Sequence, residues 1–342
     1  MSGVPLLAAE DLEKRFDLAH GLVQRLRGRP RRAVRALNGV SLEVEAGETL
    51  GIVGESGCGK STLARCLVRL LEPEAGRVRY RGADLATLSP AERRQFNRRV
   101  QMIFQDPYSS LNPRMSVGQI LGEALAVHGL RSRTERPVRI AELLDMVRLP
   151  ADAAARYPHE FSGGQRQRIG IARALSVEPE LIVADEIVSA LDVSVQAQIV
   201  NLLLRLQERL GLALVFVSHD LRIVRHVSHR VAVMYLGQIM EIGPAGSLFE
   251  TPRHPYTRAL LDAAPSLEPG RPARRPAAEG ELPSPVDPPA GCLFSTRCPH
   301  VFDRCRRERP VLTNRGGPAH RAACHLAEFG APAAATPIAV PA

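Results

Sequence analysis

Short apolar runs alternate along the chain with longer segments in which apolar residues recur at helical spacing. Three runs predict buried parallel strands, because they are short, rich in β-branched residues and followed by polar residues: Thr49–Val53, Leu181–Ala184 and Leu212–Val217. Between the last two, the spacing predicts an amphipathic helix over Val195–Leu210. This alternation predicts an α/β fold with helices on both faces of the sheet.

The segments around this core have other patterns. Strands are expected over residues 5–16 and 36–50, with a basic loop over Gly21–Arg35 between them. Helices in several pieces, interrupted by prolines, are expected from Leu85 to Leu149. Val231–Glu241 has the pattern of a hairpin that turns at a Leu-Gly pair.

The C-terminal part has little regular pattern. Residues 264–290 are dense in proline and alanine, which favours a linker. A small cysteine-containing unit is expected over residues 291–326, and disorder over residues 331–342.

Composition narrows the class of protein. A chain of 342 residues with an apolar fraction of 45% has room for one large domain with an appendage, or for two domains. No apolar run reaches the length of about 18 residues that a membrane-spanning helix needs, and the N-terminus lacks the basic region of a secretory signal, so we expect a cytosolic chain. The net charge of +9 suits a nucleic-acid partner, but the arginines are spread along the whole chain, so none is expected.

A glycine-rich loop supplies the first candidate chemistry. It has the pattern G-x-x-x-x-G-K-S and consists of Gly54, Glu55, Ser56, Gly57, Cys58, Gly59, Lys60 and Ser61. A predicted strand precedes it and a predicted helix over Thr62–Leu70 follows, which is the context that a phosphate-binding loop requires. Backbone N–H groups would surround a polyphosphate at the helix N-terminus, Lys60 would contact the β- and γ-phosphates, and Ser61 would hold Mg²⁺.

Two acidic residues follow the predicted strand at Leu181–Ala184. Asp185 is expected in the Mg²⁺ shell, and Glu186 is expected to orient or deprotonate an attacking water. Gln105 and His219 are polar residues that follow two other apolar runs. For His219 taken alone, a structural histidine at the end of a strand is the better interpretation.

A second glycine turn, at Ser162-Gly163-Gly164-Gln165, opens another predicted helix. A helix N-terminus of this kind suits a phosphate group. The first loop already surrounds the phosphates of its own nucleotide, so the second turn favours a dimer with each nucleotide between two chains.

Together these residues resemble the ATP-binding subunit of an ABC transporter. The resemblance implies a P-loop NTPase fold over residues 1–260, with a RecA-like core, an antiparallel β subdomain and a helical subdomain at about residues 106–178. It identifies, in order, the Walker A loop at Gly54–Ser61 with Thr62 beside it, the Q-loop at Gln105, the signature at Ser162–Gln165, Walker B at Leu181–Asp185, the catalytic Glu186, the D-loop at Ser189–Asp192 and the switch His219.

The resemblance also implies ligand contacts and roles. ATP and Mg²⁺ are the implied ligands, with Ser61, Gln105 and Asp185 at the Mg²⁺ ion. Glu186 would be the general base and His219 the sensor of the γ-phosphate. Phe16 occupies the place of the aromatic residue that stacks on adenine, with a core phenylalanine as the alternative.

The resemblance extends to the oligopeptide and dipeptide importers, and within them to the F-type ATPase subunit. The segments that carry it are Gln105–Arg114, Tyr157–Phe161, Asp192–Gln198, His254–Leu261 and Glu281–Pro285. It implies ATP hydrolysis that drives peptide import at the cytoplasmic face of the membrane, and a C-terminal extension over residues 261–330. The implied partners are a paralogous ATPase subunit in a heterodimer, two permease subunits and a solute-binding protein.

Ile187 departs from this family, which usually has proline after the catalytic glutamate. Isoleucine adds an N–H donor and a β-branched side chain. We expect the loop to form nevertheless, because Asp185, Glu186 and Ser189–Asp192 are intact. Whether hydrolysis is altered is a hypothesis that the Ile187→Pro exchange would test.

Four cysteines gather in the C-terminal part, at Cys292, Cys298, Cys305 and Cys324. The unit has too little apolar content for a core of its own, so a metal ion that stabilises it is physically attractive. Spacings of this kind are not those of a zinc ribbon. The resemblance implies a [4Fe–4S] cluster on these four residues, with zinc and unliganded buried thiols as the alternatives.

Two other functions compete with transport. A soluble ABC ATPase that acts on nucleic acid or ribosomes usually has two cassettes or a long coiled coil, whereas the segment between Ser61 and Ser162 has room only for a compact helical subdomain. A subunit that binds ATP without hydrolysing it is disfavoured by Glu186 and His219, and only Ile187 favours it.

Overall fold

The computed structural model describes residues 4–18, 32–106, 110–263, 283–315 and 319–326. The predicted tail at 331–342, most of the predicted linker and most of the basic loop at Gly21–Arg35 lie outside these residues. The helices are α2 (Lys60–Leu67), α3 (Pro90–Arg99), α5 (Val117–Val127), α6 (Arg136–Met146), α7 (Gly163–Ser176), α8 (Val193–Leu210), α9 (Leu221–Val227), α10 (Ala245–Glu250), α11 (Pro255–Ala263) and α12 (Asp303–Arg307). The strands are β1 (Leu7–Asp17), β2 (Ala33–Val44), β3 (Thr49–Val53), β4 (Ala75–Tyr80), β5 (Ala83–Asp84), β6 (Val100–Ile103), β7 (Leu181–Asp185), β8 (Ala213–Val217), β9 (Arg230–Tyr235), β10 (Gln238–Pro244), β11 (Thr313–Asn314) and β12 (Arg321–Ala322).

The centre of the molecule is a mixed sheet with the strand order β11-β12-β10-β9-β3-β8-β7-β6. From β9 to β6 neighbouring strands are parallel, whereas the pairs β9–β10, β10–β12 and β12–β11 are antiparallel. The three predicted core strands and the hairpin at Val231–Glu241 are confirmed as β3, β7, β8 and β9–β10. The α/β prediction is therefore confirmed.

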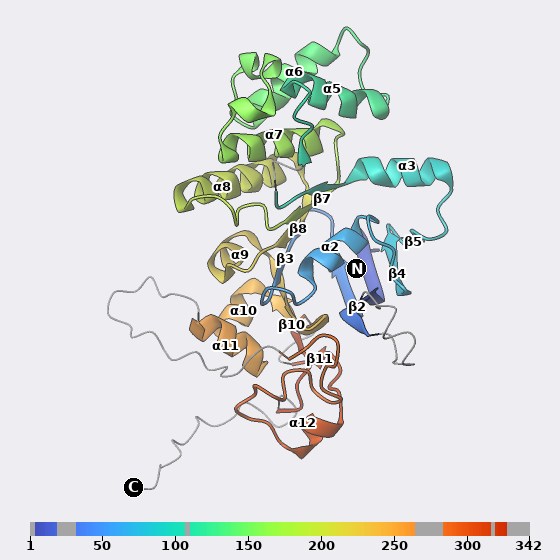
Figure 1. The fold of residues 1–342 in the computed structure, drawn as a ribbon, viewed down its shortest axis with the longest axis vertical. Helices are drawn as coiled ribbons and strands as arrows, with labels where there is room; N and C mark the ends of the chain where they lie inside the picture. The colour runs from blue at the N-terminus through green and yellow to red at the C-terminus, as the bar shows by residue number, and fades with distance from the viewer. Residues whose placement is uncertain (1–3, 19–31, 107–109, 264–282, 316–318, 327–342) are drawn as a thin grey trace, which may run out of the picture.

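Both faces of this sheet are buried, as the continuous apolar strands predict. In β7, Leu181 and Val183 pack on one side with Leu63 of α2, while Ile182 packs on the other with Leu203 of α8. A second sheet, antiparallel and ordered β2-β1-β4-β5, covers the α2 side, so that α2 lies between the two sheets (Figure 1). This enclosure fixes the helix that follows the glycine loop.

The helices α5, α6 and α7 form a layer of their own at one end of the molecule (Figure 1). The helical prediction for Leu85–Leu149 is wrong at Val100–Ile103, which forms β6 at the edge of the large sheet. The apolar run was visible in the sequence, but it is too short for its period to distinguish strand from helix.

Residues 283–315 and 319–326, here called the C-terminal segment, lie at the opposite end of the molecule from α5 and α6 (Figure 1). The segment joins the large sheet through β12, which pairs with β10. His320 Nε2 lies 2.7 Å from Oε1 of Glu241, a β10 carboxylate that is fully buried and also accepts hydrogen bonds from the N–H groups of Arg253 and His254. Within the described residues, no helix combines the length and hydrophobicity needed to cross a membrane.

His254 gives the fold a pH dependence. Its side chain is buried, and Nδ1 accepts a hydrogen bond from Tyr256 N–H. Burial lowers the pKa of His254 from 6.5 to about 4, and Glu241 offsets this only in part. Below pH 6.5 the unfolded chain therefore binds a proton that the folded chain does not, and folding stability falls as the pH falls towards 4.

We expect the free energy of unfolding to decrease by about 1.4 kcal/mol per pH unit between pH 6.5 and pH 4 through this residue. Urea unfolding at several pH values measures this loss. In the His254→Asn variant the slope should flatten, whereas the matched exchange at the exposed His226 should leave it unchanged. Equal slopes for unaltered protein and His254→Asn would contradict the assignment.

Candidate functional site

The glycine loop begins where β3 ends, at the carboxyl edge of the parallel strands. Gly54 and Gly59 have φ angles of 156° and 105°, which residues with a side chain rarely adopt. A Cβ atom on Gly54 would lie 2.2 Å from the Met234 carbonyl oxygen, and one on Gly59 would lie 2.3 Å from that of Ala36. The loop is therefore pressed against neighbouring backbone, and only glycine permits this at both positions.

Lys60 opens α2 and is almost completely buried beneath the loop. Its ammonium group donates hydrogen bonds to the carbonyl oxygens of Gly54, at 2.9 Å, and Glu55, at 3.1 Å. It also lies 3.7 Å from Glu186 Oε1. The loop thus holds one concentrated positive charge at its inner side, as binding of phosphate groups requires.

Ser61 and Asp185 meet although they come from different strand–loop units. Ser61 Oγ donates a hydrogen bond to Asp185 Oδ1 at 2.9 Å. Burial raises the pKa of Asp185, the hydrogen bond from Ser61 opposes this shift, and the charge of Glu186 adds to it. A buried carboxylate beside a hydroxyl group is the hard oxygen donor set that Mg²⁺ prefers, so these residues fit that ion.

Glu186 lies at the centre of a polar cluster. Gln105 Nε2 donates hydrogen bonds to Glu186 Oε2, at 3.3 Å, and to Ser189 Oγ, at 3.5 Å. His219 Nδ1 lies 3.7 Å from Glu186 Oε2 on the open side of the cluster, where 54% of the His219 side chain is exposed. Sequence analysis predicted that Gln105, Glu186 and His219 belong to one site, and the structure brings them together.

The second glycine turn lies elsewhere in the chain's own fold. Ser162 caps α7, with its Oγ accepting from Gln165 N–H, and Gln165 Oε1 accepts from Ser162 N–H. A Cβ atom on Gly164 would lie 2.4 Å from Cγ1 of Val195, in the first turn of α8. In the described residues, no hydrogen bond or ion pair joins Ser162–Gln165 to the glycine loop. Within the described part of one chain, neither kind of interaction therefore connects the two predicted phosphate-binding turns.

Two further predicted residues differ in exposure. The Phe16 ring is 39% exposed at the end of β1, with the Lys14 ammonium 5.8 Å from its centroid, so it is not a core phenylalanine. Cys58 is buried in the core on the α2 side of the sheet, and burial raises the pKa of its thiol. A neutral buried thiol is a packing residue and a poor nucleophile.

Glu55 has contacts that sequence analysis missed. Its backbone N–H donates to Tyr256 Oη of α11 at 3.0 Å, and its carboxylate forms an ion pair with Arg297 of the C-terminal segment. Tyr256 lies in a segment that carries the family resemblance, which was a usable signal. Nothing in the sequence around Arg297 marks it, because its partner is 242 residues away.

The predicted iron–sulfur cluster on Cys292, Cys298, Cys305 and Cys324 is wrong. Among the described residues, which include all four cysteines, no three His, Cys, Asp or Glu side chains are arranged to hold a metal ion. Burial raises the pKa of the Cys292 thiol to about 11 and that of the Cys298 thiol to about 12. Cys292, Cys305 and Cys324 are buried, and Cys298 is half-buried.

The reason for this error is that the C-terminal segment does not need a core of its own. Cys292, Phe294 and Cys305 belong to the same apolar cluster as α8 and the large sheet. The Phe294 ring lies 5.5 Å from that of Tyr235 and 5.4 Å from that of Tyr256, centroid to centroid. Packing against the larger unit supplies the stability that a metal ion was expected to provide.

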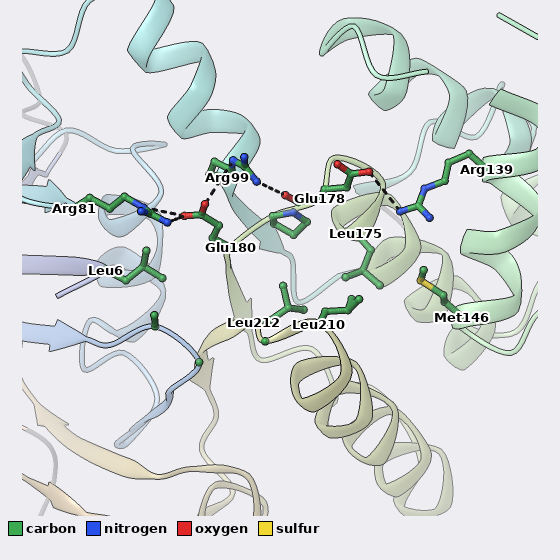
Figure 2. A pocket seen from close by; sticks show the side chains of 14 residues that line it. Leu6, Arg81, Arg99, Arg139, Met146, Leu175, Glu178, Glu180, Leu210 and Leu212 are labelled. Atoms are coloured by element: carbon green, nitrogen blue, oxygen red, sulfur yellow. Dashed lines mark hydrogen bonds and ion pairs between the residues drawn. The ribbon is translucent and has the colours of Figure 1, made fainter. Parts of the chain in front are cut away.

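A cavity of about 390 Å³ lies away from the glycine loop, between the small sheet, the large sheet and α6. Figure 2 shows its charged groups turned towards one another rather than into the open space. Glu180 accepts hydrogen bonds from Arg81, at 2.9 and 3.1 Å, and Glu178 Oε1 lies 3.9 Å from Arg139. The pairs connect the end of β4 and helix α6 to the residues before β7. Because these arginines are paired with carboxylates, the glycine loop is the better candidate site for phosphate.

Comparison with protein families agrees with this geometry. A family model described as ABC transporter matches residues 37–189, and one described as oligopeptide/dipeptide transporter, C-terminal region, matches residues 240–305. The chain is 52% identical over 329 residues to a putative oligopeptide transport ATP-binding protein of Bacillus subtilis, which covers 95% of this chain and 97% of the relative. It is 49% identical over 323 residues to a di/tripeptide transport ATP-binding protein of Pseudomonas aeruginosa, covering 94% and 98%.

Solved structures share the fold. A dimeric ATP-binding cassette in a post-hydrolysis state with ADP and phosphate superposes with a TM-score of 0.60 at 28% identity, covering 70% of this chain and 98% of that one. A subunit of an ABC transporter complex from Clostridium perfringens also has a TM-score of 0.60, at 25% identity, covering 72% and 91%.

Ile187 is buried, with 2% exposed, in the apolar cluster that contains α8. The loop around it forms as expected, since Glu186 N–H donates to Val217 O and Ser189 N–H donates to Glu186 O. We expect Ile187→Ala to lower the free energy of unfolding by about 2–5 kcal/mol, because it leaves a cavity in a closed site. Denaturant unfolding measures this, with Val311→Ala, at a 72% exposed position, as the control that should change little. A loss of less than about 1 kcal/mol for Ile187→Ala would show that the site collapses around the smaller side chain.

Proposed function

The chain belongs to the ATP-binding proteins of the ABC transporter family, and we propose that its ATP hydrolysis drives the import of peptides across the cytoplasmic membrane. The observation that carries the proposal is the convergence of the glycine loop, the Ser61–Asp185 pair and Glu186 at one edge of the sheet. The peptide transport named for relatives at 49% and 52% identity over almost the whole chain supports the choice of cargo.

The residues of the loop provide for the substrate and its metal ion. Lys60 and the loop N–H groups would bind the phosphates, with Gly54–Thr62 around them and the exposed Phe16 ring against adenine. Ser61, Asp185 and Gln105 would hold Mg²⁺, which supplies positive charge to the phosphate oxygens during transfer. Burial disfavours the charged form of Asp185, and a nearby cation would stabilise that form.

Glu186 is positioned to act on water. Its carboxylate lies beside both the lysine that would contact the phosphates and the exposed His219. In the proposed reaction Glu186 takes the proton of the attacking water, while His219 contacts the γ-phosphate and Gln105 orients Glu186 and the water. A protein that bound nucleotide without hydrolysing it would not need this carboxylate.

The proposed assembly is a head-to-tail dimer with two permease subunits and a solute-binding protein. Because no hydrogen bond or ion pair of the described residues joins Ser162–Gln165 to the glycine loop of their own chain, each nucleotide would lie between one chain's loop and the partner's signature turn. A paralogous ATPase subunit is the proposed partner. The chain would then lie at the cytoplasmic face of the membrane, bound to the permeases rather than inserted in the bilayer.

We also propose a division of the chain into two parts. Residues 1–260 would form the ATPase domain, with a helical subdomain at about residues 106–178, and residues 261–330 would form a C-terminal extension. The match of residues 240–305 to a transporter C-terminal model supports this extension. A soluble ATPase that acts on nucleic acid or ribosomes is not favoured, because the relatives are transport proteins.

We expect Glu186→Gln to reduce ATP hydrolysis at least about 100-fold while ATP binding is retained, because only the proton acceptor is removed. The ATPase rate and the Kd for ATP of the purified chain measure this. Glu208→Gln, an equivalent exchange on the exposed face of α8, should leave both within about twofold. A Glu186→Gln variant that keeps a tenth of the rate would refute the role of general base.

The transport part has its own test. Cells whose only copy of this subunit carries Glu186→Gln should lose uptake of labelled di- and oligopeptides, while the subunit still purifies with its permeases. If these cells took up peptides at the unchanged rate, peptides would be excluded as the cargo, even if the unaltered chain is an active ATPase.

A further inference from the structure

An ion pair connects the C-terminal segment directly to the phosphate loop. Arg297 Nη1 donates hydrogen bonds to both carboxylate oxygens of Glu55, at 3.0 and 2.9 Å. The Arg297 side chain is only 10% exposed, and that of Glu55 28%, so water screens the pair less than it would on an open surface. This contact lies between the second residue of the loop and a residue that no nucleotide-binding motif contains.

The guanidinium group of Arg297 also contacts Tyr235. Arg297 Nη1 also donates to Tyr235 Oη at 3.4 Å, and its guanidinium carbon lies 5.9 Å from the centroid of the Tyr235 ring. Tyr235 in turn packs against Tyr256, with ring centroids 4.6 Å apart. The arginine is therefore fixed by packed aromatic rings rather than free to follow Glu55.

Glu55 is held through all three of its polar groups. The carboxylate pairs with Arg297, the N–H donates to Tyr256 Oη, and the carbonyl oxygen accepts from Lys60. Arg297 and Tyr256 lie outside the loop, whereas Lys60 carries the positive charge at the loop's inner side. A displacement of Glu55 would thus be transmitted to Lys60.

Glu55 also places a negative charge in a loop that has to accept the negative charges of a polyphosphate. An unpaired carboxylate there would repel the ligand, and a paired one would not. We propose that Arg297 is a positioning residue for nucleotide: by neutralising and fixing Glu55 it sets the affinity of the glycine loop, and so gives the C-terminal segment control over ATP binding. The inference rests on the proposed nucleotide site.

The proposal predicts a particular order of affinities. Arg297→Gln leaves Glu55 unpaired and should raise the Kd and KM for ATP about tenfold, with kcat at saturating ATP within about threefold. Arg297→Lys keeps the charge without the paired hydrogen bonds and should raise the Kd less. Glu55→Gln should bind ATP at least as tightly as the unaltered chain. The double variant Glu55→Gln, Arg297→Gln should return to within about threefold of the unaltered Kd, because the uncompensated charge is gone.

The measurement is a titration of the full-length chain with ATP and Mg²⁺, alongside steady-state hydrolysis. Arg304→Gln is the matched control, since Arg304 forms an exposed pair with Glu308 in the same segment, at 2.8 Å, away from the loop. It should leave the Kd unchanged. A role of Arg297 in stability alone would lower the active fraction without raising KM.

The outcomes distinguish a failure of the Arg297 inference from a failure of the proposed function. If Arg297→Gln binds ATP within twofold of the unaltered chain, or if the double variant binds as weakly as Arg297→Gln, the inference is overturned and the proposed function stands. If the unaltered chain neither binds nor hydrolyses ATP, both fall. Should Arg297→Gln not fold, Arg297→Lys and the double variant decide the question by the same order of affinities.

Discussion

The parallel pairing of β3, β8 and β7 determines where the chemistry of this protein can lie. Val217 of β8 is in register with Ile52 of β3 on one side and with Asp185 of β7 on the other. The three strands therefore end at the same level, and the residues that follow them emerge side by side. The glycine loop, Glu186 and His219 become neighbours through this register alone, although they are far apart in the chain.

The second constraint is that the loop and its helix are enclosed. With α2 packed between two sheets, Lys60 and Asp185 are buried, and their charges have to be compensated locally. The loop carbonyls and Glu186 do this for Lys60, and Ser61 donates to Asp185. The same groups are those that a phosphate and a cation would contact in the proposed site.

Sequence analysis predicted what local pattern and motif spacing can encode. The core strands were predictable from short apolar runs and α8 from its helical spacing, whereas the meeting of Gln105, Glu186 and His219 was implied by the resemblance to a known family. The strand at Val100–Ile103 was missed, since a segment of four residues is too short to show a distinguishing period. Arg297 and the state of the cysteines depend on contacts between distant segments, and neither composition nor spacing reports such packing.

These distant contacts give the C-terminal segment its physical importance. Glu241, fully buried on β10, is satisfied by two backbone N–H groups near α11 and by His320 of the segment. Removing the segment would take away one of the three partners of the Glu241 carboxylate. The segment is thus coupled to the sheet through Glu241 and to the phosphate loop through Glu55. Both of these contacts are made by side chains of the segment, His320 and Arg297, whereas β12 joins the segment to β10 by backbone pairing.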